Sequence, residues 1–189
     1  MAKILAFSGS ARKASYNQAV AAAAAKLAEQ QGAEVTLVNL ADYAMPIFNE
    51  DEEAATGMPA NARAFKELLM SHDAFIIVSP EYNSSYPALL KNAIDWASRM
   101  EEGEKPLQAF KGKNALIMAS SSGAIGGMRV LVVLRMLLAN IGINVLPAQK
   151  AISKVDSLIE DGVLTDEKTL KQVGNLVAGL IDFTDKLNG

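Results

Sequence analysis

The chain has 189 residues, of which 50% are hydrophobic and 21% are charged, a composition ordinary for a globular protein with a sizeable core. Its net charge of −3 gives no electrostatic footprint for nucleic acid, and its lack of cysteine excludes disulfides, thiolate nucleophiles and iron–sulfur sites. A single histidine, His72, makes a protein-built transition-metal site or a histidine-based catalytic triad improbable.

The first third of the chain predicts a strand, a helix and a second strand. Residues 3–8 form an apolar run with no signal-peptide pattern before it, so we expect a strand and a cytoplasmic protein. A polar loop over residues 9–15 leads into an alanine-rich helix over residues 16–31, which Gly32 is placed to end. Residues 34–40 read as the second strand.

The middle of the chain predicts a loop, two helices and a buried strand. Residues 42–59 carry two prolines and an acidic run, Glu50–Glu53, which we interpret as a solvated loop and not as a metal site. A helix is expected over residues 60–70. The continuous apolar run of residues 74–79 is typical of a central parallel strand. Pro87 suits the first position of a helix reaching about residue 100.

The last third predicts two strands and two helices. Strands are expected over residues 113–120 and 143–147, and helices over residues 124–141 and 165–187. The longest apolar region, residues 125–146, resembles a membrane span in length. Arg129 and Arg135 lie inside it, and each is costly at bilayer depth, so a buried helix followed by a strand is the better interpretation. Both arginines then need partners, and an interface salt bridge is the first hypothesis.

Strands that alternate with helices indicate an α/β fold, a doubly wound five-stranded parallel sheet with helices on both faces and strand order 2-1-3-4-5. We expect residues 1–189 to form one domain. Ligands of such sheets bind outside the carboxyl ends of the strands, near the point where the strand order reverses. The site is therefore predicted in three polar junctions: loop 1 (residues 9–17), loop 2 (residues 80–86) and loop 3 (residues 120–127).

Loop 1 reads GSARKASYN and has the composition of an anion cradle. Ser10 and Ser15 offer hydroxyl groups, Arg12 offers a fork of donors, and the start of the next helix offers backbone N–H groups. Ser15 is also able to cap that helix, and the alternative is a strand-to-helix turn whose serines bond only to local backbone. The loop lacks the signatures of triphosphate and dinucleotide sites, so a mononucleotide phosphate fits better.

Loops 2 and 3 offer groups for a flat ligand with polar edges. Loop 2 and the proline after it read PEYNSSYP; the alternative is a proline-closed turn with Tyr82 and Tyr86 as surface aromatics. Loop 3 reads SSSGAIGG, whose small residues let a backbone approach a ring closely; its alternative is a flexible turn.

These three blocks, with LKNAIDW at residues 90–96 and with Arg129 and Arg135, resemble the NADPH-dependent FMN reductase family, which includes quinone, azo-dye and chromate reductases. The likeness spans most of the chain, and loop 2 is its most specific part. The resemblance implies a flavodoxin-like domain that binds FMN and uses NADPH or NADH as co-substrate. It also implies a homodimer or homotetramer with the active site near a subunit interface.

The resemblance assigns a cofactor-binding role to residues of each loop. On loop 1 these are Ser10, Arg12, Ser15, Tyr16 and Asn17, with the phosphate held by all but Tyr16. On loop 2, beside the isoalloxazine edge, they are Pro80, Glu81, Tyr82, Asn83 and Ser85. On loop 3, against the ribityl chain or the ring, they are Ser120, Ser121, Ser122 and Gly123. The chain departs from the family pattern at Ser84, Tyr86 and Ala88, and the first two lie where substrate approaches.

The chemistry is expected to belong to the cofactor, with no side chain acting as the catalyst. A nicotinamide delivers hydride to the flavin and leaves before the acceptor enters, which is a ping-pong cycle. The acceptor remains open among quinone, free flavin, azo compound and metal oxyanion, as does the choice between NADPH and NADH. Two alternatives remain: a flavodoxin-type electron carrier without NAD(P)H turnover, and a flavin-free protein that binds another phosphate ligand.

Overall fold

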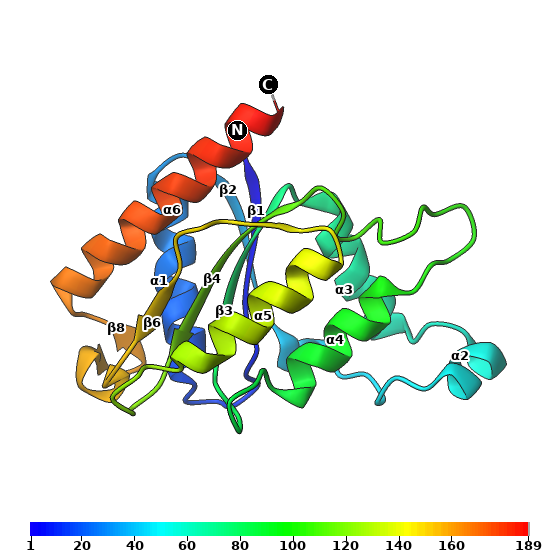
Figure 1. Ribbon diagram of the computed structural model, residues 1–189, viewed down its shortest axis with the longest axis horizontal. Helices are drawn as coiled ribbons and strands as arrows, with labels where there is room; N and C mark the ends of the chain where they lie inside the picture. Colours follow the sequence, from blue (N-terminus) through cyan, green and yellow to red (C-terminus); the bar gives the residue numbers. More distant parts are fainter. Residues whose placement is uncertain (189) are drawn as a thin grey trace.

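The computed structural model describes residues 1–188 and contains a parallel sheet with helices on both faces (Figure 1). The strands of the main sheet run in the order β2-β1-β3-β4-β5, and β6 pairs with β4. Their bounds, with those of a separate hairpin, are β1 Lys3–Ser8, β2 Glu34–Asn39, β3 Ala74–Ser79, β4 Asn114–Ser120, β5 Asn144–Val145, β6 Lys150–Ile152, β7 Ile159–Glu160 and β8 Val163–Leu164. The predicted fold class and strand order are confirmed.

Six α-helices and two short 3-10 helices complete the described residues. They are α1 Tyr16–Gln30, η1 Leu40–Tyr43, α2 Glu50–Thr56, α3 Ala60–Ser71, α4 Ala88–Ser98, α5 Met128–Asn140, η2 Val155–Leu158 and α6 Glu167–Asn188. Among residues 1–188, no helix combines the length and the apolar content needed to cross a membrane.

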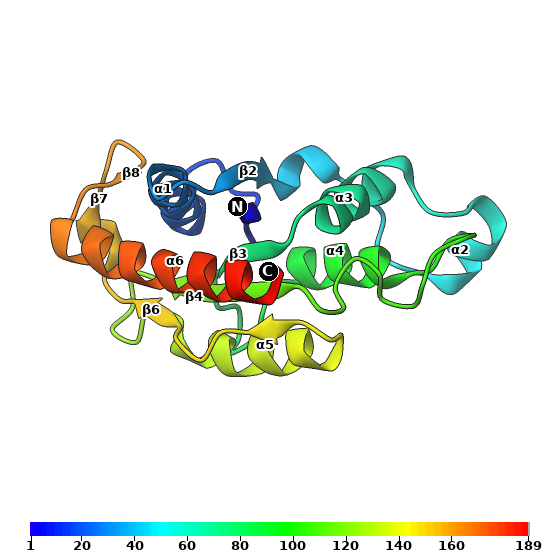
Figure 2. The same ribbon diagram turned by 90° about the horizontal axis from the view of Figure 1, so that it is seen from above.

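Two apolar cores enclose the sheet, one on each face. Helices α1 and α6 pack on one face against Ile4, Ile76 and Met118, whereas α3, α4 and α5 pack on the other against neighbouring strand positions such as Phe75 and Ile117. Figure 2 shows α5 and α6 on opposite sides of the sheet. Because both faces are covered, β1, β3 and β4 are apolar along almost their whole length, as expected for central parallel strands.

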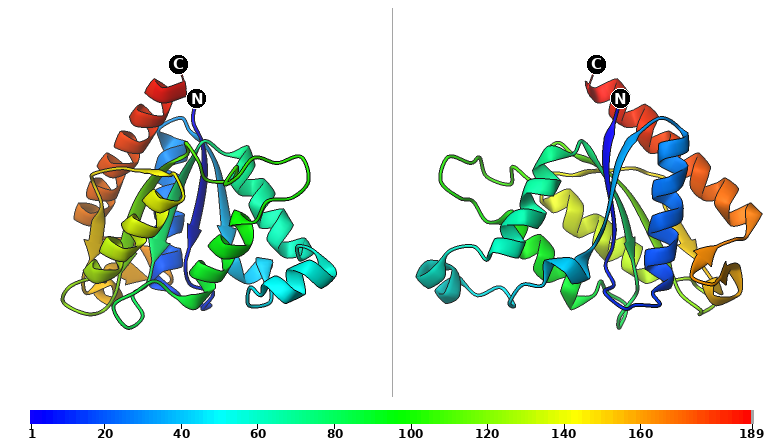
Figure 3. Two further views of the ribbon diagram at one scale, coloured as in Figure 1. Left: turned by 45° about the vertical axis from the view of Figure 1, so that its right-hand side comes forward. Right: turned by 180° about the vertical axis from the view of Figure 1, so that it is seen from behind.

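The two ends of the chain lie together at one end of the sheet, and the three predicted loops lie at the other (Figure 3). The amino group of Met1 is 3.4 Å from Asp185 Oδ1, which brings the start of β1 beside the end of α6. All strands of the main sheet are parallel, so the carboxyl ends of β1, β3 and β4 point to the same edge. Loops 1, 2 and 3 leave from that edge.

Several predicted boundaries and one predicted loop are wrong. The acidic run Glu50–Glu53 is not a loop but the beginning of α2, since Asn49 Oδ1 accepts from Asp51 N–H at 2.9 Å and the carboxylates lie at the positive helix end. Helix α5 begins at Met128 instead of residue 124, because Gly126 and Gly127 adopt positive φ of 62° and 80°. Pro87 caps α4 and does not belong to it.

The sheet after β4 also differs from the prediction. The strand expected over residues 143–147 is reduced to β5, which pairs only with Asn114 and Ala115. The chain then leaves the sheet and returns as β6, which pairs with Met118–Ser120. The β7–β8 hairpin was not predicted either; its two central residues, Asp161 and Gly162, have positive φ.

Candidate cofactor site at the carboxyl edge of the sheet

Loops 1, 2 and 3 meet around a hollow of about 210 Å³ at the carboxyl ends of β1, β3 and β4. All residues that line it belong to the predicted set, and they are Ser10, Arg12, Ser15, Tyr16, Asn17, Pro80, Glu81, Tyr82, Ser120, Ser121 and Ser122. The other predicted residues, Asn83, Ser85 and Gly123, lie in the same loops without lining the hollow.

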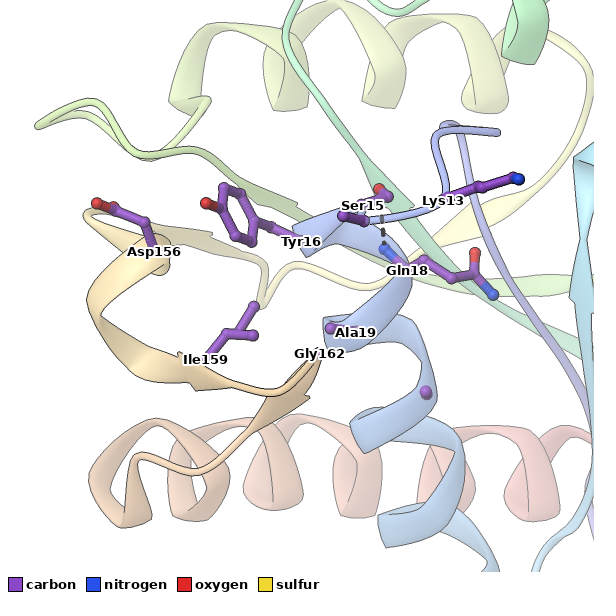
Figure 4. A pocket seen from close by; sticks show the side chains of 10 residues that line it. Lys13, Ser15, Tyr16, Gln18, Ala19, Asp156, Ile159 and Gly162 are labelled. Atoms are coloured by element: carbon purple, nitrogen blue, oxygen red, sulfur yellow. Dashed lines mark hydrogen bonds between the residues drawn. The ribbon is translucent and has the colours of Figure 1, made fainter.

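A larger hollow, of about 330 Å³, lies between the start of α1 and the β7–β8 hairpin (Figure 4). It shares Ser15 and Tyr16 with the site but takes its other residues from loop 1 (Lys13 and Ala14), from α1, from the segment after β6 and from the hairpin. Its wall contains Ala19, Ala22 and Ile159 and only two charged side chains, Lys13 and Asp156. The smaller hollow therefore has the denser set of hydroxyl and amide groups, and it is the one that the strand order predicts.

Loop 1 presents an anion site at the start of α1. Ser15 is the N-cap of this helix, and its Oγ accepts from Gln18 N–H at 3.3 Å, which confirms the predicted cap. The first turn of α1 holds no acidic side chain. Ser10 and Ser15 are each 6% exposed, so their hydroxyl groups are fixed in place and not freely solvated.

Arg12 supplies the positive charge of this end. Its guanidinium carbon lies 5.5 Å from the centre of the Tyr16 ring, a cation–π contact that orients the side chain. Within residues 1–188 no carboxylate lies within 4.0 Å of it. Two other cations are already paired, Lys91 with Asp95 at 2.7 Å and Arg99 with Glu53 at 2.8 Å.

Loop 2 forms a tight two-residue turn. Tyr82 and Ser85 exchange both backbone hydrogen bonds, at 2.9 and 3.0 Å, and the central residues Asn83 and Ser84 have φ of 50° and 65°, as in a type I′ turn. Tyr82 is 55% exposed at the rim of the hollow. Tyr86 is half-buried and packs against the core, so only one of the two tyrosines is a surface aromatic.

Loop 3 is hydrogen-bonded to the segment around β6, which favours an ordered loop over the flexible turn considered as its alternative. Ser121 N–H donates to Ile152 O at 3.1 Å, and Gly123 O accepts from Gly126 N–H at 3.2 Å. At the start of the loop, the Oγ of Ser120 is buried and has no hydrogen-bond partner among the described residues. An unpaired buried hydroxyl is costly, and Ser120 is also one of the residues that line the hollow.

Two side chains predicted as ligands also tie the loops together, which the sequence did not reveal. Asn17 is 5% exposed and makes two hydrogen bonds to the backbone of Ser120. Asn17 Nδ2 donates to Ser120 O at 3.1 Å, and Ser120 N–H donates to Asn17 Oδ1 at 3.0 Å. Glu81 Oε2 accepts from the backbone N–H groups of Arg129 at 2.9 Å and Val130 at 3.3 Å. Asn17 thus connects loop 1 to loop 3, and Glu81 connects loop 2 to the start of α5.

The partners of the two arginines in the apolar region lie within the chain. Arg129 Nη1 is 3.5 Å from Glu81 Oε1, and Arg135 donates to Leu146 O at 2.7 Å and to Gln149 Oε1. Both arginines thus have partners within the chain, and an interface salt bridge stays an untested hypothesis. His72 is the C-cap residue of α3; it is 7% exposed and hydrogen-bonded to Leu68 O and Thr36 Oγ1, at the amino end of the sheet and away from the hollow.

The residues present fit FMN by the chemistry of their donors. Buried hydroxyl groups, an unpaired guanidinium and a helix N-terminus form a set suited to a phosphate dianion. Ser120, whose buried Oγ has no hydrogen-bond partner among residues 1–188, lines the same hollow. Among residues 1–188, no three histidine or acidic side chains lie together in a way that could hold a metal ion.

Comparisons with known proteins agree with this arrangement. The family model described as NADPH-dependent FMN reductase matches residues 2–156. A quinone reductase of Escherichia coli is 34% identical over 184 residues, which are 95% of this chain and 93% of that protein. An NAD(P)H-dependent FMN reductase of Pseudomonas aeruginosa is 34% identical over 189 residues, 99% of this chain and 97% of that protein.

Solved structures give the same picture. The flavoenzyme NAD(P)H:acceptor oxidoreductase FerB of Paracoccus denitrificans has a TM-score of 0.80 at 31% identity, with 98% of each chain covered. An archaeal flavodoxin has a TM-score of 0.62 at 11% identity, covering 97% of this chain and 99% of that one, which shows the shared fold alone.

Proposed function

Since this chain belongs to the NADPH-dependent FMN reductase family and is an FMN-dependent NAD(P)H oxidoreductase, we propose that quinones are its acceptors and that the hollow between loops 1, 2 and 3 holds the FMN. The observation that carries the site proposal is Arg12, which lies near a helix N-terminus beside two buried serine hydroxyl groups and has no acidic partner among residues 1–188. Quinones are proposed because several relatives of similar length are named as quinone reductases.

The work of the protein is to bind and orient. Arg12, Ser10 and Ser15 would bind the phosphate, with Asn17 fixing the wall behind it. Loop 2 would present its rigid turn, and loop 3 its buried Ser120 hydroxyl, to the rest of the cofactor. When bound, FMN supplies the redox centre that takes hydride from NAD(P)H and reduces the acceptor. We propose that one surface receives both substrates in turn, which gives parallel lines in double-reciprocal plots.

We further propose that the protein is a homodimer or homotetramer and works in the cytoplasm. Met128, Val132 and Met136 are 54%, 66% and 58% exposed and are spaced four residues apart, so they form one apolar stripe along α5. Helix α5 follows loop 3 directly, and a second copy on this stripe would stand beside the site. The hollow, at about 210 Å³, is smaller than the roughly 300–1,000 Å³ of most ligand pockets, which suits a site that a partner completes.

The first experiment is an absorbance spectrum of protein mixed with excess FMN, desalted, and then treated anaerobically with NADPH and a quinone. Retained flavin absorbance that bleaches with NADPH and returns with quinone supports the proposal. Flavin that is retained but does not bleach with NADPH or NADH indicates an electron carrier. Flavin that is not retained, with no saturable binding in a titration, contradicts the site.

Arg12→Ala tests the phosphate site directly, and Lys13→Ala is its control. A charge-assisted hydrogen bond contributes about 1.5–3 kcal/mol, so loss of Arg12 should weaken FMN binding by about 10- to 100-fold. Lys13 is the adjacent cation but lines the other hollow, so its loss should change FMN affinity less than threefold. Equal effects of the two substitutions in a fluorescence titration would indicate general electrostatic attraction instead of a built site.

A further inference from the structure

The Glu81 carboxylate has an unusual position for a residue predicted to face a cofactor. It is only 13% exposed, and its Oε2 accepts from two successive backbone N–H groups, those of Arg129 and Val130. These groups belong to the first turn of α5, where N–H groups have no acceptor inside the helix. Glu81 therefore caps a helix that begins 47 residues further along the chain, from the other side of the site.

Helix α5 has no cap of its own. Its N-cap residue is Gly127, with φ of 80° and no side chain to accept a hydrogen bond. A side chain at Gly127 would place Cβ 3.1 Å from Ala119 Cβ and 3.6 Å from Glu81 Cβ. The tight contact with Ala119 and the positive φ both favour glycine at this position, so the N-cap residue has no side-chain acceptor, and Glu81 supplies the acceptor that a serine or aspartate usually supplies.

The same contact joins two walls of the site. Glu81 belongs to loop 2, next to the Tyr82–Ser85 turn, while Arg129 follows loop 3. The negative charge of Glu81 lies against a positive helix end, and Arg129 Nη1 is 3.5 Å from its other oxygen. Both carboxylate oxygens are therefore directed toward α5.

We propose that Glu81 is a positioning residue, which holds loop 3 against loop 2 in the cofactor-binding conformation before the cofactor arrives. This inference rests on the proposed function, because it concerns the same hollow. It assigns the side chain of Glu81 to the protein scaffold and leaves the backbone of loop 2 to face the ligand. Loss of this cap should free the start of α5 and, with it, the conformation of loop 3.

Glu81→Ala and Glu81→Gln separate positioning from direct contact. Alanine removes the acceptor, whereas glutamine keeps one oxygen that can accept from Arg129 and Val130 N–H. Helix caps have modest but measurable effects, so Glu81→Ala should weaken FMN binding by about 3- to 30-fold and Glu81→Gln by less than about threefold. The lost ion pair with Arg129 adds little, because Arg129 is 62% exposed.

Amide hydrogen exchange of the FMN-free protein gives a readout that does not depend on activity. Residues 126–130 should exchange about 3- to 30-fold faster in Glu81→Ala and near the wild-type rate in Glu81→Gln. Asp166→Ala is the matched control, because Asp166 Oδ2 caps α6 through Thr169 N–H at 2.8 Å, outside the lining of the hollow. It should destabilise the protein to a similar degree and leave both FMN affinity and exchange at residues 126–130 unchanged.

The outcomes are distinct. Glu81→Ala with wild-type exchange at residues 126–130, or with wild-type FMN affinity, overturns the inference. Equal loss of FMN affinity in Glu81→Ala and Glu81→Gln, with unchanged exchange, also overturns it and indicates that the carboxylate contacts the cofactor. Wild-type protein that binds no FMN at all would instead contradict the proposed function itself.

Discussion

Gly126, in loop 3, allows one of the closest backbone approaches in the protein. A Cβ atom at this position would lie 2.6 Å from Ile152 C and from Ser153 N, and 2.8 Å from Ile152 N. All three are backbone atoms at the end of β6, so the conflict cannot be relieved by turning a side chain. The φ of Gly126 is also positive, at 62°, a conformation that side chains disfavour. Gly126→Ala therefore combines steric overlap with backbone strain.

The expected cost follows from these two terms. Positive φ in a residue with a side chain costs about 1–2 kcal/mol, and overpacking against a fixed neighbour costs about 1–3 kcal/mol. Replacing glycine also lowers the conformational entropy of the unfolded chain, which stabilises the folded protein by about 0.4–1 kcal/mol. The net loss in the free energy of unfolding should be about 1–4.6 kcal/mol. For a protein of this size, that lowers the Tm by roughly 2–18 °C.

Gly162→Ala is the matched control. Gly162 has a φ of 79°, in the turn between β7 and β8, and apart from its two chain neighbours no described residue has a heavy atom within 4 Å of the Cβ position. The substitution carries strain without overlap, so it should cost about 1 kcal/mol or less. Urea denaturation of both variants gives the comparison. Equal losses of stability would refute the steric reasoning and place the whole effect on φ.

Gly126→Ala should also weaken FMN binding at the site. Ile152 O accepts from Ser121 N–H, so displacement of β6 moves a residue that lines the hollow. Weaker FMN binding at a temperature where the variant is fully folded is the expected sign, and Gly162→Ala should bind FMN like the wild type. Unchanged FMN affinity in a destabilised Gly126→Ala would mean that loop 3 tolerates movement of β6.

Three further outcomes test other parts of the structure. Ser84→Gly should raise the free energy of unfolding by about 0.5–1 kcal/mol, because it relieves a positive φ of 65°; a lower urea midpoint would contradict the strain. Val132→Lys should shift the protein toward the monomer in light scattering, since it adds a charge to the exposed stripe on α5, and an unchanged mass would place the interface elsewhere. Hydrogen bonds from Thr169 hold the pKa of Asp166 below its usual 3.8. The stabilisation it gives is therefore present above pH 3.8 and is lost as the pH falls through its folded-state pKa, so the stability difference between wild type and Asp166→Ala should shrink in acid.

The sheet was predictable because its central strands are apolar on both faces. The predicted bounds of β1 and β3 agree with the structure, since a short continuous apolar run between polar junctions has few other uses in an α/β chain. Strand order then follows from the commonest arrangement, and the order places the site at the carboxyl edge. The location of the hollow was therefore contained in the pattern of strands and in the polarity of the three loops.

The shorter elements were not predictable from local pattern. Strand β6 exists because β5 pairs only with the first residues of β4, which leaves the end of β4 open to another segment. Three residues of sequence carry no period that distinguishes this strand from a loop. Helix α2 carries conflicting signals. Its acidic first turn suits a helix N-terminus, but the helix lies in a stretch whose prolines and glycine indicate an irregular loop.

The division of labour among the polar residues of the site depends on partners that are distant in the chain. Residue type shows that Arg12, Asn17 and Glu81 can donate or accept hydrogen bonds, and their position after a strand shows where they lie. Only the folded structure shows that Asn17 bonds Ser120 and that Glu81 bonds the start of α5, while Arg12 has no carboxylate partner among the described residues, 1–188. A polar residue at the carboxyl edge of a parallel sheet thus has two possible roles, to bind the ligand or to hold the loops that bind it. The side chains already satisfied within the protein are those expected to hold the loops, and the unpaired Arg12 and Ser120 Oγ are those expected to meet the ligand.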